Sequence, residues 1–288
     1  NWPAGEGNKP DIWCRYSDNG GITWSSAEKV NDDASTQNHH QWAPAIWCDV
    51  TSGRLYVQWM DTRDTPTSDS ALIYASYSDN GGQSFVTNQQ ISNEKMIINC
   101  ATCGGGGTPR YQGDYNGIVS NEVTSMSVWA DFRWGTFASF VSYFPDYAMS
   151  LSSAKSTEGV NTIYAEVPDV KLYTEDVNFS ATMETPPSGS FSISYPSGNT
   201  LSSFPGNIPI QITDNSVPSG NYTCTVTGEG PNGTPVHVRE ILVSVVASAP
   251  PVADFIADDI APLIGNQVNF TDLSTNAPDS WSWTFNPA

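Results

Sequence analysis

The sequence predicts an all-β protein in which repeated sheet units are followed by two further β modules. The first observation is an internal repeat: residues 17–24 and 78–85 share the run Ser-Asp-Asn-Gly-Gly and lie 61 positions apart (78 − 17). The second is a Trp-x-Asp-x-Arg pattern at residues 59–63 that recurs at 129–133. The third is composition, because 23 glycines and 20 prolines without a long helical period are typical of short strands and turns. Repeats of this period predict a propeller or a solenoid.

Each of the two octapeptides predicts a tight turn at the end of a strand. Paired glycines can adopt the positive φ values that a tight hairpin needs. The side chains of Asn19 and Asn80 are expected to hydrogen-bond the backbone of their own turn. The closing aromatic residue, Trp24 or Phe85, is expected to fold back as an apolar plug between strands.

The repeated region, residues 1–150, is predicted to hold about two and a half four-stranded blades. Strands of the first complete blade are predicted at residues 43–49, 54–59 and 71–77. Strands of the next blade are predicted at residues 113–118, 125–129 and 137–144. Residues 1–30 are typical of the outer half of an earlier blade. Because a closed propeller needs at least about four blades, we expect upstream sequence or another chain to supply the rest.

Both octapeptides resemble the Asp-box, or BNR, repeat of sialidase-like β-propellers. Asn19 and Asn80 stand where that family usually has Asp, which is a common variant. The resemblance implies the fold of a blade. It does not imply a chemistry, because in the family this turn lies on the outer rim of the blade.

Two further modules are predicted after the repeats. Residues 160–247 are predicted to form short strands in which apolar and polar residues alternate. Residues 218–228 resemble a strand pair of Ig-like repeats in bacterial surface proteins. Residues 251–288 resemble the N-terminal half of a PKD domain. The predicted fold class is therefore all-β: the C-terminal blades of a β-propeller, an Ig-like β-sandwich and a partial PKD (Ig-like) domain. This order resembles large secreted or surface-anchored bacterial proteins exported by type IX secretion.

Charge excludes two classes of partner. The net charge is −19 and Lys and Arg total only 11, so the chain repels nucleic acids and anionic membranes. The sequence contains no run of about eighteen apolar residues, so it predicts no membrane-spanning helix. The acidity suits a secreted or cell-surface location, where Asp- and Asn-rich loops could hold Ca²⁺.

Five cysteines allow several readings. Cys14 and Cys48 lie in strand-like runs of neighbouring blades, where a disulfide is plausible. Cys100 and Cys103 form a C-x-x-C pair that is expected to close a disulfide across a loop. A zinc site would need a second ligand pair, for which His39 and His40 are the candidates, and a redox pair would need a βαβ context that the sequence lacks. The remaining Cys224 is expected to be a small buried strand residue.

The resemblance to sialidases also implies catalytic residue types. Such enzymes grip the substrate carboxylate with three arginines and use a Tyr–Glu nucleophile and an Asp acid. Arg63, Arg133, Asp114, Tyr115 and Glu122 could serve these roles. The repeated spacing of each arginine from an aspartate favours a different role, a structural pair that ties one blade to the next. The glycine-flanked pair at 114–115 is expected to face the central channel.

Aromatic residues are the other candidates for binding. Trp42 and Trp134 are expected in loops, where their faces could stack on sugar rings. Trp47, Trp59 and Trp129 lie in predicted strands and are expected in the blade core.

One acidic loop is a candidate metal site. Asp61, Asp64 and Asp69 could bind Ca²⁺, and the alternative is a solvated acidic loop.

Three functions remain open from the sequence. The first is a non-catalytic segment of a secreted surface protein whose propeller binds glycans or surface proteins on an Ig-like and PKD stalk. The second is an exo-sialidase-type glycoside hydrolase with most catalytic residues upstream. The third is a structural subunit of a surface appendage.

Overall fold

The structure is a computed structural model, and it describes residues 10–34, 39–65, 70–98, 115–154, 160–246, 251–263, 265–276 and 280–284. Within these ranges every regular element is a strand, apart from one short 3₁₀ helix, η1 (Pro231–Gly233). The predicted all-β class is therefore confirmed. In the described ranges, no helix is long and apolar enough to cross a bilayer.

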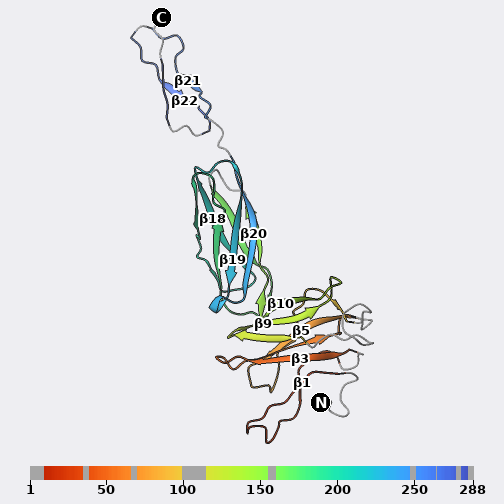
Figure 1. Cartoon of the computed structure of the whole chain (residues 1–288). Coiled ribbons are helices and arrows are strands. Elements are labelled where there is room, and N and C mark those ends of the chain that lie inside the picture. The colour runs from red at the N-terminus through yellow and green to blue at the C-terminus, as the bar shows by residue number, and fades with distance from the viewer. Residues whose placement is uncertain are drawn as a thin grey trace.

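The N-terminal part is a stack of three antiparallel sheets (Figure 1). Sheet 1 pairs β1 (Trp13–Cys14) with β2 (Glu28–Lys29). Sheet 2 contains β3 (Gln41–Cys48), β4 (Leu55–Asp61), β5 (Ser70–Ser78), β6 (Gln89–Gln90) and β7 (Met96–Ile97). Sheet 3 contains β8 (Gly117–Asn121), β9 (Thr124–Asp131) and β10 (Ala138–Phe144). The strands predicted at 54–59, 71–77, 125–129 and 137–144 correspond to β4, β5, β9 and β10.

The two octapeptide turns have nearly the same geometry. Gly20 and Gly21 have φ values of 70° and 87°, and Gly81 and Gly82 have 71° and 86°. In the first turn, Asn19 Oδ1 accepts the backbone N–H of Thr23 at 2.9 Å; the corresponding bond in the second turn measures 3.0 Å. The expected positive φ and side-chain bonding are confirmed.

The expected aromatic plug forms in only one of the two turns. Phe85 packs against the cluster between sheets 1 and 2. Trp24, at the corresponding position of sheet 1, is 60% exposed, so the prediction is wrong for this residue. The reason is that no described sheet lies on the outer side of sheet 1.

Burial on both faces of sheet 2 holds the stack together. Side chains alternate along a strand, so Val57 and Trp59 of β4 face sheet 1. Tyr56 and Met60 face sheet 3, where they join Trp129 in a second cluster. Every residue of β4 after Leu55 is buried for this reason.

Asp49 joins sheet 2 to sheet 3 at the octapeptide end of the strands. Its Oδ2 accepts the hydroxyl of Ser120 at 2.6 Å and the N–H of Glu122 at 2.9 Å, both from sheet 3. Its Oδ1 accepts the N–H groups of Thr51 and Ser52 at 2.9 and 2.8 Å. Although burial opposes the charged form, these hydrogen bonds lower the pKa of Asp49 far below its ordinary value.

The next module consists of two four-stranded antiparallel sheets packed face to face. One sheet has the order β12 (Ser150–Ala154), β13 (Val160–Val167), β18 (Gly206–Asn215) and β16 (Ser190–Ser194). The other has the order β17 (Thr200–Leu201), β15 (Val177–Met183), β19 (Gly220–Glu229) and β20 (Val236–Val245). The first strand begins at Ser150, upstream of the predicted boundary at residue 160.

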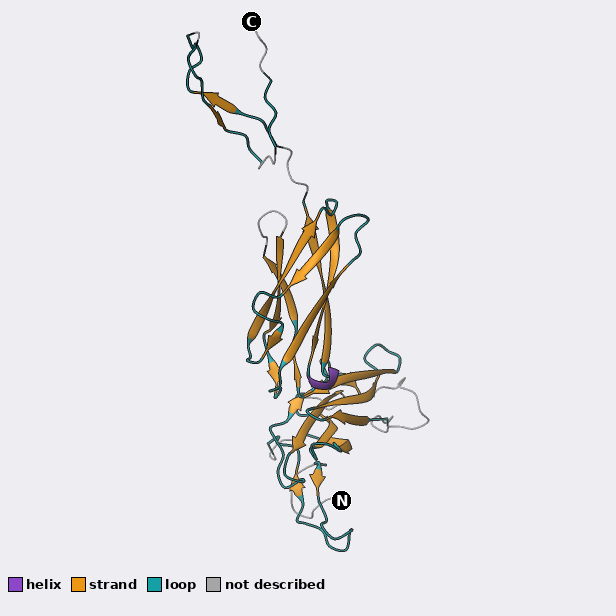
Figure 2. Cartoon of the chain, turned by 90° about the vertical axis from the view of Figure 1, so that its left-hand side faces the viewer, coloured by secondary structure: helices purple, strands orange, loops and turns teal. Residues whose placement is uncertain are grey.

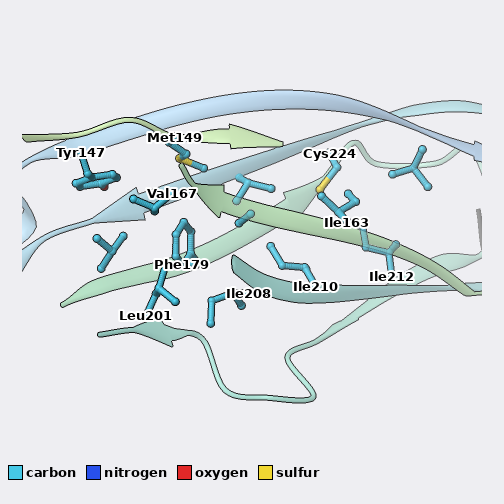
Figure 3. Packing of buried hydrophobic residues seen from close by; sticks show 14 of the residues in the cluster. Tyr147, Met149, Ile163, Val167, Phe179, Leu201, Ile208, Ile210, Ile212 and Cys224 are labelled. Atoms are coloured by element: carbon cyan, nitrogen blue, oxygen red, sulfur yellow. The ribbon is translucent and has the colours of Figure 1, made fainter. Parts of the chain in front are cut away.

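Alternating residues of both sheets form the core of this two-sheet module (Figure 3). Ile208 and Ile210 of β18 face Phe179 of β15. Cys224 of β19 has no exposed surface, which confirms its prediction as a small buried strand residue.

A polar and aromatic junction connects the two-sheet module to sheet 3. The short strands β11 (Asp146–Tyr147) and β14 (Val170–Lys171) pair there. His237 Nε2 lies 2.7 Å from Asp146 Oδ1, and its ring meets the ring of Tyr147 edge-on at 4.7 Å. Asn121 donates to the carbonyl of Asn232 in η1 at 3.2 Å, and Figure 2 shows η1 at this junction.

The C-terminal segment is a small hairpin of β21 (Phe255–Ala257) and β22 (Phe270–Asp272). Phe255 and Phe270 pack edge-to-face at 5.7 Å, and both contact Trp283. These aromatic side chains stay exposed because the described part of this segment has no second layer.

We expect Asp49→Ala to lower the free energy of unfolding at pH 7 by about 2–3 kcal/mol, because partly buried donors of sheet 3 lose their acceptor. The pKa of Asp49 is lower in the folded state, so its contribution is present above about pH 4 and is lost as the pH falls further. Urea unfolding of wild type and variant at pH 7 and at pH 3 measures this difference.

The matched control for this prediction is Asp18→Ala, which changes an exposed aspartate. It should leave stability within about 0.5 kcal/mol at either pH. An Asp49→Ala effect that was equal at both pH values would contradict the account.

Candidate functional site

Most of the predicted site residues lie at one end of the sheet stack, which we call the loop end. Here β3 and β8 begin and β4 and β9 end. Asn116 donates to the carbonyl of Ala43 at 3.2 Å, so the starts of β8 and β3 are adjacent. The octapeptide turns lie at the opposite end of the strands.

Trp59, Asp61 and Arg63 form a closed network at the end of β4. Trp59 Nε1 donates to Asp61 Oδ2 at 2.9 Å. The backbone N–H of Arg63 donates to Asp61 Oδ1 at 2.8 Å, and its Nε donates to Oδ2 at 2.9 Å. Gln41 of β3 donates to Asp61 Oδ1 at 3.1 Å. A carboxylate with no exposed surface is thereby given four donors.

Sheet 3 repeats the same network at the end of β9. Trp129 Nε1 donates to Asp131 Oδ2 at 3.4 Å. The backbone N–H and the Nε of Arg133 donate to the two oxygens of Asp131, each at 2.7 Å. The Trp-x-Asp-x-Arg pattern therefore encodes one local structure twice.

Each arginine then reaches across to the preceding sheet. Arg63 Nη1 donates to Asp32 Oδ1 at 2.6 Å, just after β2 of sheet 1. Arg133 Nη1 donates to Asn93 Oδ1 at 2.7 Å, just after β6 of sheet 2. Asp32 and Asn93 are themselves 61 positions apart (93 − 32). The prediction that these pairs tie one repeated unit to the next is confirmed by these contacts.

Aromatic rings complete the surroundings of both arginines. The guanidinium of Arg63 lies 4.3 Å from the ring centre of Tyr74, and that of Arg133 lies 4.2 Å from that of Phe140. Although burial opposes the charge, the Asp61 carboxylate raises the pKa of Arg63. Both side chains are mostly buried, so neither presents its guanidinium to a common cup.

The residues proposed for a nucleophile do not meet. Tyr115 precedes β8, whereas Glu122 follows it in the turn to β9. Five strand residues between them correspond to roughly 17 Å. Asp114 lies outside the described residues, so its position beside Tyr115 stays a prediction.

Two aromatic side chains are exposed at the loop end. Tyr115 is 83% exposed and Trp134 is 69% exposed. The ring of Trp134 is supported by an edge contact with Phe140 at 4.9 Å. This pair is the described part of the loop end best suited to stack on a ligand ring.

The other tryptophans partly depart from expectation. Trp59 and Trp129 are buried as predicted. Trp42 lies in β3 and packs against the cluster between sheets 2 and 3, so its placement in a loop is wrong. Trp47 is exposed on the edge strand β3, so its placement in the core is wrong.

The predicted Ca²⁺ ligands do not converge in the described residues. Asp61 is saturated by the donors named above. Asp64 accepts a short hydrogen bond from the hydroxyl of Tyr74, and burial together with this carboxylate raises the pKa of Tyr74. Asp69 lies outside the described ranges, and within them no group of three potential metal ligands occurs.

The predicted disulfide between Cys14 and Cys48 is not formed. Both are free thiols: Cys14 lies against Gly82, and Cys48 is exposed near the carbonyls of Asp49 and Gly53. The strand that carries Cys14 packs against β5, whereas the strand that carries Cys48 is hydrogen-bonded to β4. Cys100 and Cys103 lie outside the described residues, so their pairing stays a prediction.

Sequence reasoning did not identify Asp32, Asn93 or Asp49 as residues that join sheets. The 61-position offset between Asp32 and Asn93 is a signal that could have found the first two. Comparison of the chain with family models and with curated proteins gives no match. The geometry of the loop end is therefore the basis for any functional proposal.

We expect Arg133→Ala to lower the free energy of unfolding by about 3–5 kcal/mol, because Asp131 would remain buried without its cation. Arg133→Lys should recover only part of the loss, because an ammonium cannot reproduce the fork of hydrogen bonds. Urea unfolding followed by tryptophan fluorescence measures both variants.

Arg15→Ala is the matched control, since Arg15 is exposed and donates to the carbonyl of Ser25 at 2.9 Å. It should change stability by less than about 1 kcal/mol. If Arg133→Ala unfolded at the wild-type urea concentration, the structural role assigned to the network would be wrong.

Proposed function

We propose that the chain is a non-catalytic segment of a secreted, multidomain cell-surface protein. The sheet stack forms part of a sialidase-like propeller whose loop end binds glycans or protein partners. The two-sheet module, in the role of an Ig-like domain, and the PKD-like hairpin act as a stalk. Further blades come from upstream sequence or from another chain.

The observation that carries this proposal is the contrast between arginines and aromatics at the loop end. Arg63 and Arg133 direct their donors to structural acceptors in the preceding sheet, which leaves little guanidinium surface for a substrate carboxylate. Tyr115 and Trp134 instead present exposed rings. A site with exposed aromatic rings, in which the arginines already bond other protein groups, suits ligand recognition by stacking better than acid–base catalysis.

Charge and composition support a surface location. A net charge of −19 keeps the chain away from nucleic acid and anionic lipid. The sheet-on-sheet packing and the long paired strands β19 and β20 support an Ig-like spacer.

A structural role in a surface appendage is the second candidate. The outer face of sheet 3 exposes Val119, Met126 and Val141, which is the kind of surface that a neighbouring subunit covers. The exo-sialidase alternative has less support, because the arginine and Tyr–Glu candidates of this chain do not converge.

We expect Trp134→Ala to weaken binding of the chain to its glycan or surface-protein ligand about tenfold or more, through loss of stacking. Binding to a glycan array, followed by titration against the strongest glycan, measures this effect. Trp24→Ala is the matched control, because it removes another largely exposed tryptophan at the opposite end of the strands. It should leave binding within about twofold.

The same protein is assayed for release of a fluorogenic aglycone from a sialoside. The proposal expects no turnover above buffer. Turnover that Tyr115→Phe abolishes would favour the glycosidase instead, and equal losses in both tryptophan variants would contradict a binding site at the loop end.

A further inference from the structure

Within the part of the chain that the structure describes, one edge of β10 is unpaired. It is the outermost strand of sheet 3 and pairs only with β9 on its inner side. Among the described ranges, no strand pairs with its outer side. An edge of this length is a ready template for another strand.

Sheets 1 and 2 show what occupies the corresponding position. In sheet 2 the carbonyl of Ile73 accepts the N–H of Ile91 at 2.9 Å, and that of Tyr77 accepts the N–H of Val86 at 3.0 Å. In sheet 1 the carbonyls of Ile12 and Tyr16 accept from Val30 and Ser25, each at 2.9 Å. The strand β5 of sheet 2, and β1 at the corresponding position of sheet 1, are therefore each covered by the extended segment that follows the octapeptide turn, which we call the fourth segment.

Strand register relates β10 to β5 residue by residue. Trp59 pairs with Tyr74 in sheet 2, and Trp129 pairs with Phe140 in sheet 3. The arginine of each network stacks on the aromatic partner, which confirms the equivalence. Ser139 therefore corresponds to Ile73, Val141 to Ala75 and Tyr143 to Tyr77.

Two side chains of sheet 3 lack contacts that a fourth strand supplies in sheet 2. Ser76 donates to the carbonyl of Val86 at 2.6 Å, whereas its counterpart Ser142 turns to the carbonyl of its own neighbour Tyr143 at 3.4 Å. Arg63 Nη2 donates to Asn88 of the fourth segment at 3.0 Å. Arg133 bonds Asn93 of the preceding sheet, but among the described residues no amide from a fourth segment of its own sheet meets its guanidinium.

We propose that the outer edge of β10 binds an extended strand donated by a partner polypeptide. The strand adds antiparallel and bonds the backbone of Ser139, Val141 and Tyr143, as residues 86–91 do in sheet 2. The partner strand that fits this edge has two aliphatic side chains five positions apart, as Val86 and Ile91 are. Between them it has an amide side chain that reaches Arg133.

The test uses a fluorescein-labelled peptide with the sequence of residues 84–92, Ser-Phe-Val-Thr-Asn-Gln-Gln-Ile-Ser, titrated with the whole chain. Fluorescence anisotropy should show saturable binding at least tenfold tighter than that of a scrambled peptide. Hydrogen exchange should slow at the amides of Ser139, Val141 and Tyr143 when the peptide is bound. These measurements need no variant and therefore do not depend on refolding.

Val141→Pro tests the edge directly. Residues 139 and 143 correspond to Ile73 and Tyr77, whose backbone groups face the fourth segment of sheet 2. Backbone direction alternates along a strand, so the N–H of Val141 also points away from β9. Proline there removes an outward donor, which an edge strand tolerates, and should weaken peptide binding at least tenfold. Val141→Thr keeps the N–H and should bind within twofold of wild type.

Wild-type binding no tighter than that of the scrambled peptide would overturn the proposal. So would a Val141→Pro variant that binds as well as wild type. Glycan binding at the loop end is independent of this edge, so the two proposals fail or stand separately.

Discussion

Asp61 and Asp131 are carboxylates without exposed surface, and a buried carboxylate must be given donors and a cation or it destabilises the fold. In both sheets the indole two residues before and the guanidinium two residues after the aspartate meet this need. The arginine that balances the charge also has donors left over, and these reach the loop of the preceding sheet. The need to neutralise a buried carboxylate is met within the five residues of the Trp-x-Asp-x-Arg pattern. The same pattern thus determines how two sheets about sixty residues apart in the sequence are joined.

Local features of this architecture were accessible from sequence because their partners lie within a few residues. The octapeptide turns needed only paired glycines and an asparagine four positions before its N–H partner. The repeated spacing of Asp61 and Arg63 correctly indicated a structural pair. Trp42 was misplaced because a bulge in β3, with Ala43 at a φ of 51°, carries the strand through a stretch that reads as a loop.

The remaining errors depend on what lies beside each sheet, which no local pattern records. Trp24 and Phe85 occupy equivalent positions, but only Phe85 has a described sheet to pack on. Trp47 reads as a core residue, yet it lies on an edge strand. Tyr115 and Glu122 are close in sequence, but a strand places them at opposite ends of sheet 3. In a repeat, the same residue is interior or surface according to its place in the stack.

The course of β12 and β20 through the two-sheet module has a mechanical consequence. The chain enters this module beside the His237 junction and leaves it after Val245, at the far end in Figure 1. A pull between the two ends of the polypeptide therefore acts along the strands and loads their hydrogen bonds in shear. Because the ten-residue ladder between β19 and β20 must then give way together, the module resists tension far better than a hairpin opened from one end. Such a response is consistent with the stalk role proposed for this module.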